Sequence, residues 1–249
     1  MSGHSKWSKI KRKKAIADKS RGRLFSKLGR EITVAARDGG GDPSFNPRLR
    51  TAVDNAKAQR MPNENIDRAI KRGTGDLPGA AFEEITYEGY APGGAALYLE
   101  CLTDNPRRTL AQVRHLLDKR GGNLGQNGCV AWMFERKGQV ILDAGTCDSG
   151  AALEAALEAG AEDFDDEDGT YIVTAEPSAF HAVVESLKTQ GVPISGAELA
   201  MVARSGIELE GEEGRKVAAI ISALEDHDDV QKVWTNAEIE EAAWEALEE

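Results

Sequence analysis

The sequence predicts an α+β protein of several domains: an N-terminal three-helix domain with a basic arm, followed by two α/β domains, at least one of them ferredoxin-like. Three observations support this fold class. Short amphipathic helices fill residues 20–72, strands alternate with helices from residue 82 onward, and the order β-α-β-β-α-β is complete between residues 137 and 205. A chain of 249 residues is long enough for about two or three domains.

Positive charge is concentrated at the start of the chain. Residues 1–72 hold 19 Lys and Arg against 7 Asp and Glu, a net charge of +12, whereas residues 73–249 hold 12 against 35, a net charge of −23. This contrast predicts a basic module for a polyanion, carried on an acidic body that faces away from it and could engage a protein partner. A run of charge is usually only a solvated face, but here the excess has one sign, which favours nucleic-acid binding.

The N-terminal domain is predicted over residues 1–78. Residues 1–19 are basic and weakly periodic, and we expect an extended arm that orders on its ligand. A helix follows over residues 20–38 and ends at three consecutive glycines, which accept left-handed backbone geometry. Its apolar stripe lies opposite a cationic face. The stripe contains Leu24, Phe25, Leu28, Ile32, Ala35 and Ala36, and the cationic face contains Arg23, Lys27, Arg30 and Arg37.

Two shorter helices complete this domain. One is predicted over residues 47–60 and the other from Asn63, a plausible N-cap, to Arg72. Residues 76–81 read as a linker. The predicted buried positions of the two helices are Leu49, Ala52, Val53 and Ala56 in the first, and Ile66, Ala69 and Ile70 in the second.

The next part of the chain is predicted to begin an α/β domain. Strands are expected over residues 82–90, 95–103 and 129–135, with a flexible loop over residues 121–128. A helix is expected over residues 105–120, capped by Asn105 with proline at its first position. This order gives only β-β-α-β, so a helix and a strand are missing.

The missing elements appear near the C-terminus, as a helix over residues 211–225 and a strand over residues 230–234. We therefore predict that residues 79–136 and 206–249 form domain II, with the ferredoxin-like domain III, residues 137–205, inserted in it. The alternative is linear order, with separate domains over residues 80–145 and 146–249. The last residues, 236–249, are expected to form an acidic helix that packs on domain II through Ile239, Ala243 and Leu247.

Motifs for catalysis or metal binding are missing from the sequence. No GxxxxGK[ST], GxSxG or HExxH occurs. The acidic run 163–169 would place Phe164 and Ala175 where a calcium loop needs carboxylates, and the four histidines lack metal-ligand spacing. We therefore predict a protein that is not an enzyme and has no catalytic residue, cofactor or metal.

The spacing of the cysteines and the hydropathy of the sequence indicate the cellular location of the protein. Cys101, Cys129 and Cys147 lie far apart, which favours reduced thiols that act as small hydrophobic residues in an intracellular protein. No apolar run approaches the roughly 18 residues of a membrane span. We expect a cytoplasmic protein with no membrane partner.

The candidate nucleic-acid site combines the arm with the cationic helix faces. Lysine and arginine contacts to phosphate give affinity without sequence choice. Aromatic residues are few, so a stacking platform for single strands is not indicated. Trp7 either stacks on a base or anchors the arm to the protein. The predicted contacts are Lys6, Trp7, Lys9, Lys11, Arg12, Lys13, Lys14, Arg23, Lys27, Arg30, Arg68, Lys71 and Arg72.

Several motifs, spread over essentially the whole chain, carry a family resemblance. They are Gly3-His4-Ser5-Lys6-Trp7, Asp38-Gly39-Gly40 with Pro43 and Asn46, Met61-Pro62, Ile66-x-x-Ala69-Ile70, Tyr87-Glu88-Gly89-Tyr90, Asp104-Asn105-x-x-Arg108-Thr109 and Gly121-Gly122. With these motifs the chain resembles the YebC/PmpR family. The resemblance implies a cytoplasmic protein with a helical N-terminal domain and two α/β domains.

Two functions follow from this resemblance and from the charge pattern. Family members are described as probable transcriptional regulators that bind DNA, so we expect a non-enzymatic nucleic-acid-binding regulator that acts on transcription. Other members are implicated in translation on ribosomes, including a mitochondrial translational activator. The alternative is therefore a ribosome-associated translation factor that binds structured RNA by its shape. A protein-interaction scaffold without nucleic-acid binding is the third possibility.

Overall fold

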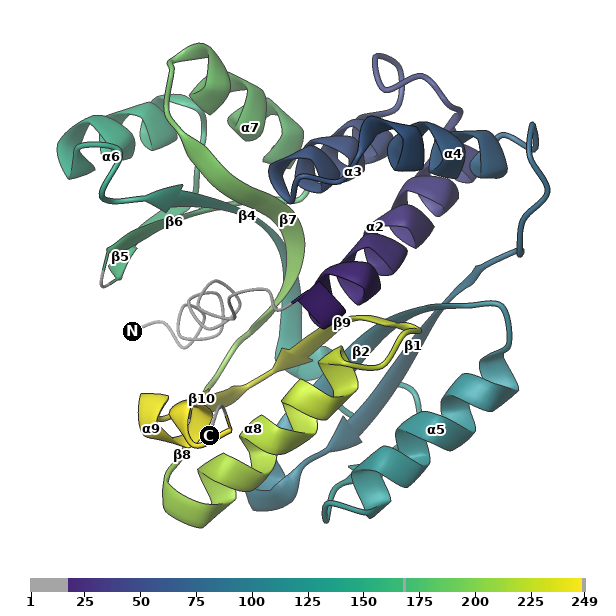
Figure 1. Ribbon diagram of the computed structural model, residues 1–249. Coiled ribbons are helices and arrows are strands. Elements are labelled where there is room, and N and C mark those ends of the chain that lie inside the picture. Colours follow the sequence, from purple (N-terminus) through teal and green to yellow (C-terminus); the bar gives the residue numbers. More distant parts are fainter. Residues whose placement is uncertain (1–17, 168, 248–249) are drawn as a thin grey trace.

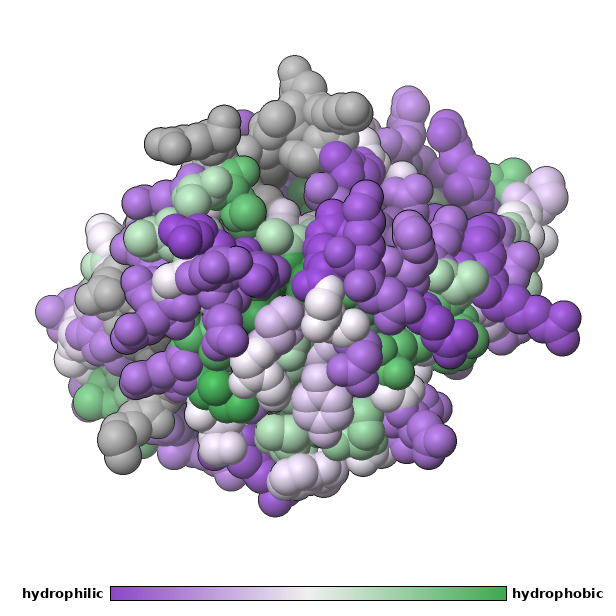
Figure 2. All heavy atoms as spheres, turned by 90° about the horizontal axis from the view of Figure 1, so that it is seen from below, coloured by the Kyte–Doolittle hydropathy of each residue, from purple (hydrophilic) through white to green (hydrophobic). Residues whose placement is uncertain are grey.

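The computed structural model describes residues 18–167 and 169–247, which form an α+β fold with an N-terminal helical region, as predicted. Figure 1 shows three groups of elements: the N-terminal helices, a four-stranded sheet with helices on one face, and a second four-stranded sheet that also has helices on one face. Hydrophilic side chains cover most of the face shown in Figure 2, with apolar residues scattered among them. No helix among the described residues is long and apolar enough to cross a membrane.

The N-terminal helices are α2 (Asp18–Gly39), α3 (Pro47–Ala58) and α4 (Asn63–Gly73). Asn46 ties two of them together, because its side chain accepts a hydrogen bond from the N–H of Leu49 at 3.0 Å and donates one to the carbonyl of Ala35 at 2.7 Å. Their shared core is apolar. It contains Ile32, Ala35, Ala36, Leu49, Ala52, Val53, Ala56, Met61, Ile66 and Ala69.

The start of α4 differs from the prediction by one residue. Pro62, not Asn63, is the N-cap, and no side chain caps the helix. The backbone of Pro62 is extended, with φ −59° and ψ 138°, so Asn63 already lies in the first turn. The prediction of Asn63 as the cap was therefore wrong, because proline supplies the required backbone geometry without a side-chain hydrogen bond.

The first sheet has the strand order β3-β1-β2-β9. Its strands are antiparallel: β1 (Glu83–Tyr90), β2 (Ala96–Thr103), β3 (Asn123–Leu124) and β9 (Val230–Thr235). The 3-10 turn η1 (Pro92–Gly94) joins β1 to β2. Helices α5 (Pro106–Asp118) and α8 (Gly211–Glu225) pack on one face of the sheet, where residues of both helices and of the strands form one apolar core. Asn105 caps α5, as predicted.

The second sheet has the strand order β5-β6-β4-β7, with every neighbouring pair antiparallel. Its strands are β4 (Phe134–Asp143), β5 (Asp163–Glu167), β6 (Thr170–Ala175) and β7 (Ile194–Ala203). Helices α6 (Ser149–Glu158) and α7 (Phe180–Thr189) cover one face. The chain order β-α-β-β-α-β with this strand order is the ferredoxin-like plan, which is confirmed.

The two sheets are interleaved along the chain. Strand β9 pairs with β2 in the first sheet, although all four strands of the second sheet lie between them in sequence. This topology supports the insertion of domain III into domain II, and the domain boundaries given above stay a prediction. Two further strands, β8 (Ile207–Leu209) and β10 (Ala237–Ile239), form a small parallel pair beside the helix α9 (Glu241–Glu245).

The strand predicted over residues 129–135 was wrong. Residues 131–133 form a 3-10 turn, η2 (Ala131–Met133), and β4 then runs without a break from Phe134 to Asp143. The buried carboxylate of Glu88 accepts hydrogen bonds from the N–H groups of Gly128, Val130 and Ala131 at 2.7–2.8 Å. These N–H groups therefore point at a side chain and are not available to a neighbouring strand.

Two other segments were also predicted wrongly. The loop over residues 121–128 contains the short strand β3, which pairs with the end of β1. The C-terminal helix predicted over residues 236–249 begins late, because residues 237–239 pair with β8 as β10. Ile239 and Ala243 are buried as expected, whereas Leu247 is exposed. Backbone pairing with a distant strand overrides the helical pattern here.

Candidate nucleic-acid interface

The predicted nucleic-acid contacts fall into three groups. Lys6, Trp7, Lys9, Lys11, Arg12, Lys13 and Lys14 lie outside the described residues. Arg23, Lys27 and Arg30 lie on α2, and Arg68, Lys71 and Arg72 lie on α4. The structure gives the two helices different surroundings.

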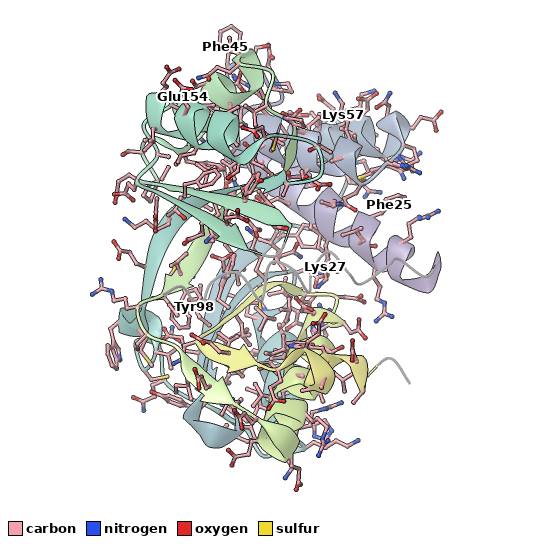
Figure 3. The ribbon with its side chains drawn as sticks, turned by 90° about the vertical axis from the view of Figure 1, so that its left-hand side faces the viewer. Phe25, Lys27, Phe45, Lys57, Tyr98 and Glu154 are labelled. Carbon is pink, nitrogen blue, oxygen red and sulfur yellow. The ribbon has the colours of Figure 1, made fainter. Side chains whose placement is uncertain are left out.

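The cationic residues of α2 face the acidic body. The Nη1 atom of Arg23 lies 3.3 Å from the carboxylate of Asp226, and the Nζ atom of Lys27 donates to the carbonyl of Glu225 at 2.6 Å. Figure 3 shows Lys27 and Phe25 on α2, above the part of the molecule that contains α8 and β9. The expectation that the acidic body faces away from this helix is therefore corrected.

The end of α8 explains this contact. The last carbonyl groups of a helix have no partner within the helix, and the helix dipole places partial negative charge there. Lys27 satisfies the carbonyl of Glu225, and Arg23 also donates to the carbonyl of Asp226 at 3.4 Å. Cations on α2 thus act as caps for a helix that lies about 200 residues further along the chain.

Asp229 is the centre of this contact. Its side chain is 3% exposed. Its carboxylate accepts hydrogen bonds from Nη1 of Arg30, Nη2 of Arg108 and Oγ1 of Thr109, each at 2.8 Å. Burial by itself opposes ionisation, but the hydrogen bonds from Arg108 and Thr109 and the charge of Arg30 outweigh it and hold the pKa of Asp229 below its ordinary value. An ionised carboxylate therefore joins α2, α5 and the start of β9.

His227 supports the same loop. Its Nδ1 atom accepts the N–H of Asp229 at 3.1 Å, so the neutral ring carries its proton on Nε2, which lies 3.0 Å from Oε1 of Gln112. Burial lowers the pKa of His227, although the nearby carboxylates of Asp229 and Asp228 oppose that shift. The ring is thus held neutral at the junction of α5, α8 and β9.

The cationic residues of α4 have a different position. Arg68, Lys71 and Arg72 are exposed, and their spacing of three and four residues places them on one side of the helix. Ile66 and Ala69 face the core on the other side. No ion pair joins these three cations to a carboxylate within residues 18–167 and 169–247. They form a cationic face available to a phosphate backbone, which we call the α4 face.

Sequence reasoning missed two further cations close to the start of α4. Lys57, in the last turn of α3, and Arg60, in the turn before α4, are both exposed. Other cations of this part of the chain are engaged internally: Arg48 pairs with Glu31, and Arg50 donates to the carbonyl of Pro43. A count of charged residues in the sequence could not distinguish the cations that contact other groups of the protein from those that stay exposed to solvent.

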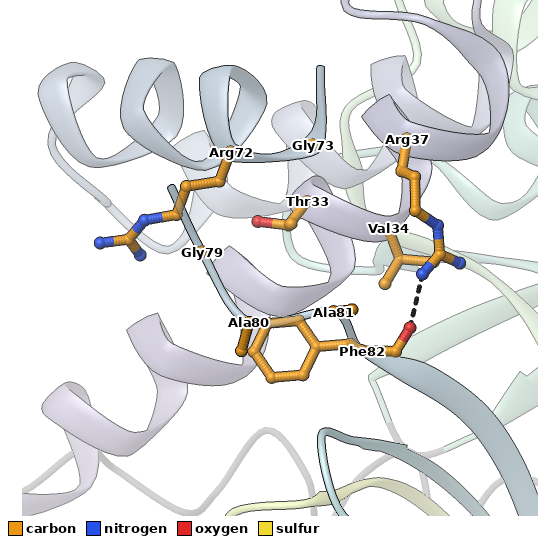
Figure 4. Close-up of a pocket in the computed structure, with 9 residues that line it drawn as sticks. All are labelled: Thr33, Val34, Arg37, Arg72, Gly73, Gly79, Ala80, Ala81 and Phe82. Atoms are coloured by element: carbon orange, nitrogen blue, oxygen red, sulfur yellow. Dashed lines mark hydrogen bonds between the residues drawn. The ribbon is translucent and has the colours of Figure 1, made fainter. Parts of the chain in front are cut away.

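Two cavities lie near these helices, and both are small. One has a volume of about 170 Å³ and lies between α2, α4 and the segment that leads to β1, beside Thr33, Arg37 and Arg72 (Figure 4). Arg37 closes one side by donating to the carbonyl of Phe82. The other, about 140 Å³, lies between α3 and α7. Small-molecule sites usually occupy about 300–1,000 Å³, so neither cavity suits a substrate of that size.

The thiols lack the surroundings of reactive groups. Cys101 is buried, and burial raises its pKa to about 12. Burial also raises the pKa of Cys129 and of Cys147. All three thiols are therefore protonated near neutral pH, and a protonated thiol is a poor nucleophile. In the described part of the chain, no group of three or more His, Cys, Asp or Glu side chains could hold a metal ion.

Comparison with known proteins gives matches over nearly the whole chain. A family model described as the TACO1/YebC protein N-terminal domain matches residues 5–76, and one described as the TACO1/YebC second and third domain matches residues 82–237. A protein of Halothermothrix orenii named "Probable transcriptional regulatory protein" is 51% identical over 252 residues, which cover 100% of both chains. A protein of Geobacter sulfurreducens with the same descriptive name is 50% identical over 247 residues, covering 99% of this chain and 100% of the relative.

A solved structure is also similar. The crystal structure of a conserved hypothetical protein from Aquifex aeolicus superposes with a TM-score of 0.86 at 49% sequence identity. The match covers 92% of this chain and 95% of that chain.

Proposed function

The chain belongs to the TACO1/YebC family, and from this premise we propose that it is a non-enzymatic transcriptional regulator that binds DNA through its basic N-terminal segment. The relatives named as probable transcriptional regulatory proteins support a regulatory role. We propose both that the protein binds DNA and that it is located in the cytoplasm.

The observation that carries the proposal is the α4 face. Arg68, Lys71 and Arg72 are exposed on one side of a helix whose other side is buried in the core. Two exposed carboxylates, Glu64 and Asp67, lie on the same side of α4, but no ion pair joins them to these three cations among the described residues. The three cations continue the charge excess of residues 1–72, whose net charge is +12.

The chemistry of this surface is phosphate neutralisation. Each Lys or Arg that contacts a phosphate releases condensed counterions, which gives affinity that falls steeply with salt. Such contacts position a protein on a duplex and carry no base preference. The acidic body, with a net charge of −23 over residues 73–249, limits the approach of a polyanion to the basic part of the surface.

The salt dependence of binding tests the proposal. If the full-length protein neutralises about six phosphates, log K for a short DNA duplex falls with log of the salt concentration at a slope of about −5. The variant Arg68→Gln/Lys71→Gln/Arg72→Gln should reduce the magnitude of that slope by about 2.7, because three contacts are lost. A slope near zero for the unmodified protein would contradict DNA binding.

A matched control separates phosphate contacts from net charge. Arg136, Arg204 and Arg215 are exposed cations of the acidic body, and Arg136→Gln/Arg204→Gln/Arg215→Gln changes the net charge by the same amount. This variant should keep the slope of the unmodified protein. Equal effects of the two triple variants would show that only long-range charge matters and would contradict the α4 face as a contact.

Structured RNA is the competing ligand. Its backbone carries the same phosphates, so the α4 face alone does not discriminate between the two nucleic acids. Retention on genomic DNA and co-sedimentation with ribosomes, compared at physiological salt, separate the two ligands. Strong ribosome association with weak retention on DNA would favour the translation factor and contradict our proposal.

A further inference from the structure

The acidic body has a cationic helix face of its own, on α5. Residues 73–249 contain 12 Lys and Arg, and five of them lie within residues 107–120, together with a single carboxylate, Asp118. The charge average over the body hides this group. Its location on one helix distinguishes it from the cations scattered elsewhere on the body.

The helix presents these cations to solvent because its other side is buried. Thr109, Val113 and Leu117 face the core shared with α8 and the first sheet. Exposed cations are Arg107 and Arg114 within α5, and Lys119 and Arg120 in the turn that follows its last residue, Asp118. Amphipathic patterning thus fixes which way the positive charge points.

These four cations lack the ion pairs that most other cations of the body form, and they lie close together, whereas Arg136, Arg204 and Arg215, which also have no ion pair among the described residues, lie on separate segments. Lys137, Lys188, Lys216 and Lys232 each form an ion pair with a carboxylate. Arg108, on the same helix, is paired with Asp104 and Asp229. By contrast, no carboxylate of the described residues pairs with Arg107, Arg114, Lys119 or Arg120, and Arg120 contacts only the carbonyl of Leu116. Their charge is therefore not neutralised within the described part of the chain.

The spacing of the cations suits a phosphate backbone. Arg107 and Arg114 are seven residues apart, close to two helical turns, so they share one face. Lys119, the C-cap residue, lies about 18 Å from Arg107 along the helix axis at 1.5 Å per residue, and about a third of a turn round it. One strand of a DNA duplex presents a phosphate about every 3.4 Å along its axis, so this distance spans about five phosphates.

We infer that α5 is a second contact for the phosphate backbone of a DNA duplex, formed by Arg107, Arg114 and Lys119. The inference rests on the proposed function for the choice of DNA, but not on the residues of the α4 face. The C-terminal end of α4, the segment that leads to β1 and the N-terminal end of α5 all lie along the right-hand edge of Figure 1. Arg107, in the first turn of α5, therefore lies at the end of this helix that Figure 1 draws nearer to α4.

The full-length variant Arg107→Gln/Arg114→Gln/Lys119→Gln tests this inference. The magnitude of the salt slope for a short DNA duplex should fall by about 2.7, and the affinity at low salt should fall with it. The control Arg136→Gln/Arg204→Gln/Arg215→Gln has the same net charge and should keep both values. Because the substituted residues are exposed, circular dichroism and thermal unfolding of each variant should match the unmodified protein.

The outcomes separate this inference from the proposed function. If the α4 variant loses slope while the α5 variant behaves like the control, the inference is overturned and the proposed function stands. If the α5 variant loses slope and the α4 variant does not, the inference stands and the α4 face is wrong. A loss seen only with an RNA duplex of the same sequence would overturn the assignment to DNA, and so would a full-length protein that binds neither duplex.

Discussion

Asp229 shows how a single buried carboxylate can join distant parts of the chain. It lies between the guanidinium groups of Arg30, on α2, and Arg108, on α5. The motif Asp104-Asn105-x-x-Arg108-Thr109, which carries part of the family resemblance, supplies two of its partners. Part of that motif therefore acts through this contact, which holds the N-terminal helices against the acidic body.

Neutralising Asp229 should weaken this contact. We expect Asp229→Asn to lower the free energy of unfolding by roughly 2–3 kcal/mol, at the low end for a broken buried ion pair because both arginines keep some contact with water. Asp226→Asn, in the same loop but exposed, should cost less than about 1 kcal/mol. Chemical denaturation of both variants measures the difference. Equal losses would contradict a central role for Asp229.

His227 should make the stability depend on pH. Its pKa is lowered in the folded protein, so the unfolded chain binds a proton more readily, and stability falls as the pH drops below the ordinary value of about 6.5. Protonation also removes the Nδ1 acceptor used by the N–H of Asp229. Between about pH 7.5 and about pH 5.5, the melting temperature should fall more for the unmodified protein than for His227→Asn. Parallel decreases would exclude His227 as the source.

At the scale of elements, close helix contacts decide whether a substitution is tolerated. A Cβ atom on Gly73, at the end of α4, would lie 2.3 Å from the carbonyl oxygen of Thr33 on α2. At Gly22, within α2, no atom of the described residues lies within 4 Å of the same position. The two glycines look alike in sequence, and only the crossing of α2 and α4 separates them.

These two glycines give a matched pair of variants. Gly73→Ala should destabilise the protein by roughly 1–3 kcal/mol, because two helices must move apart. Gly22→Ala should stabilise it by about 0.5–1 kcal/mol, since alanine favours the helix and its Cβ meets no atom of the described residues. Thermal unfolding of the two variants measures whether each substitution raises or lowers the stability of the protein. A stabilising Gly73→Ala would contradict the close approach of the two helices.

The elements that the sequence predicted well are those with strong local patterns. Periodicity and capping account for the apolar stripes of α3 and α4, the Asn105 cap, and the four strands and two helices of the ferredoxin-like plan. The errors lie where a distant group decides the backbone. Glu88 draws the N–H groups of residues 128–131 away from strand pairing, and β8 pairs with residues 237–239. Neither Glu88 nor β8 lies close in sequence to the segment whose backbone it determines, so a short stretch of sequence does not reveal the interaction.

At the scale of the whole molecule, the distribution of charged residues along the sequence predicted a basic part and an acidic part. It did not predict which residues of the two parts contact each other. The cationic face of α2 and the acidic loop before β9 are about 200 residues apart in sequence, so their contact could not be inferred from either segment. Among the predicted nucleic-acid contacts, Arg23, Lys27 and Arg30 therefore contact the acidic body, whereas the cations of α4 stay exposed. Local charge on α5 was hidden by the acidic average of residues 73–249.

Crosslinking in cells, followed by sequencing of both the DNA and the RNA recovered with the protein, tests the central claim most directly. We predict that DNA fragments are enriched over RNA, and that Arg68→Gln/Lys71→Gln/Arg72→Gln lowers this enrichment while Arg136→Gln/Arg204→Gln/Arg215→Gln does not. Recovery of ribosomal RNA with DNA at background would contradict a DNA-binding regulator.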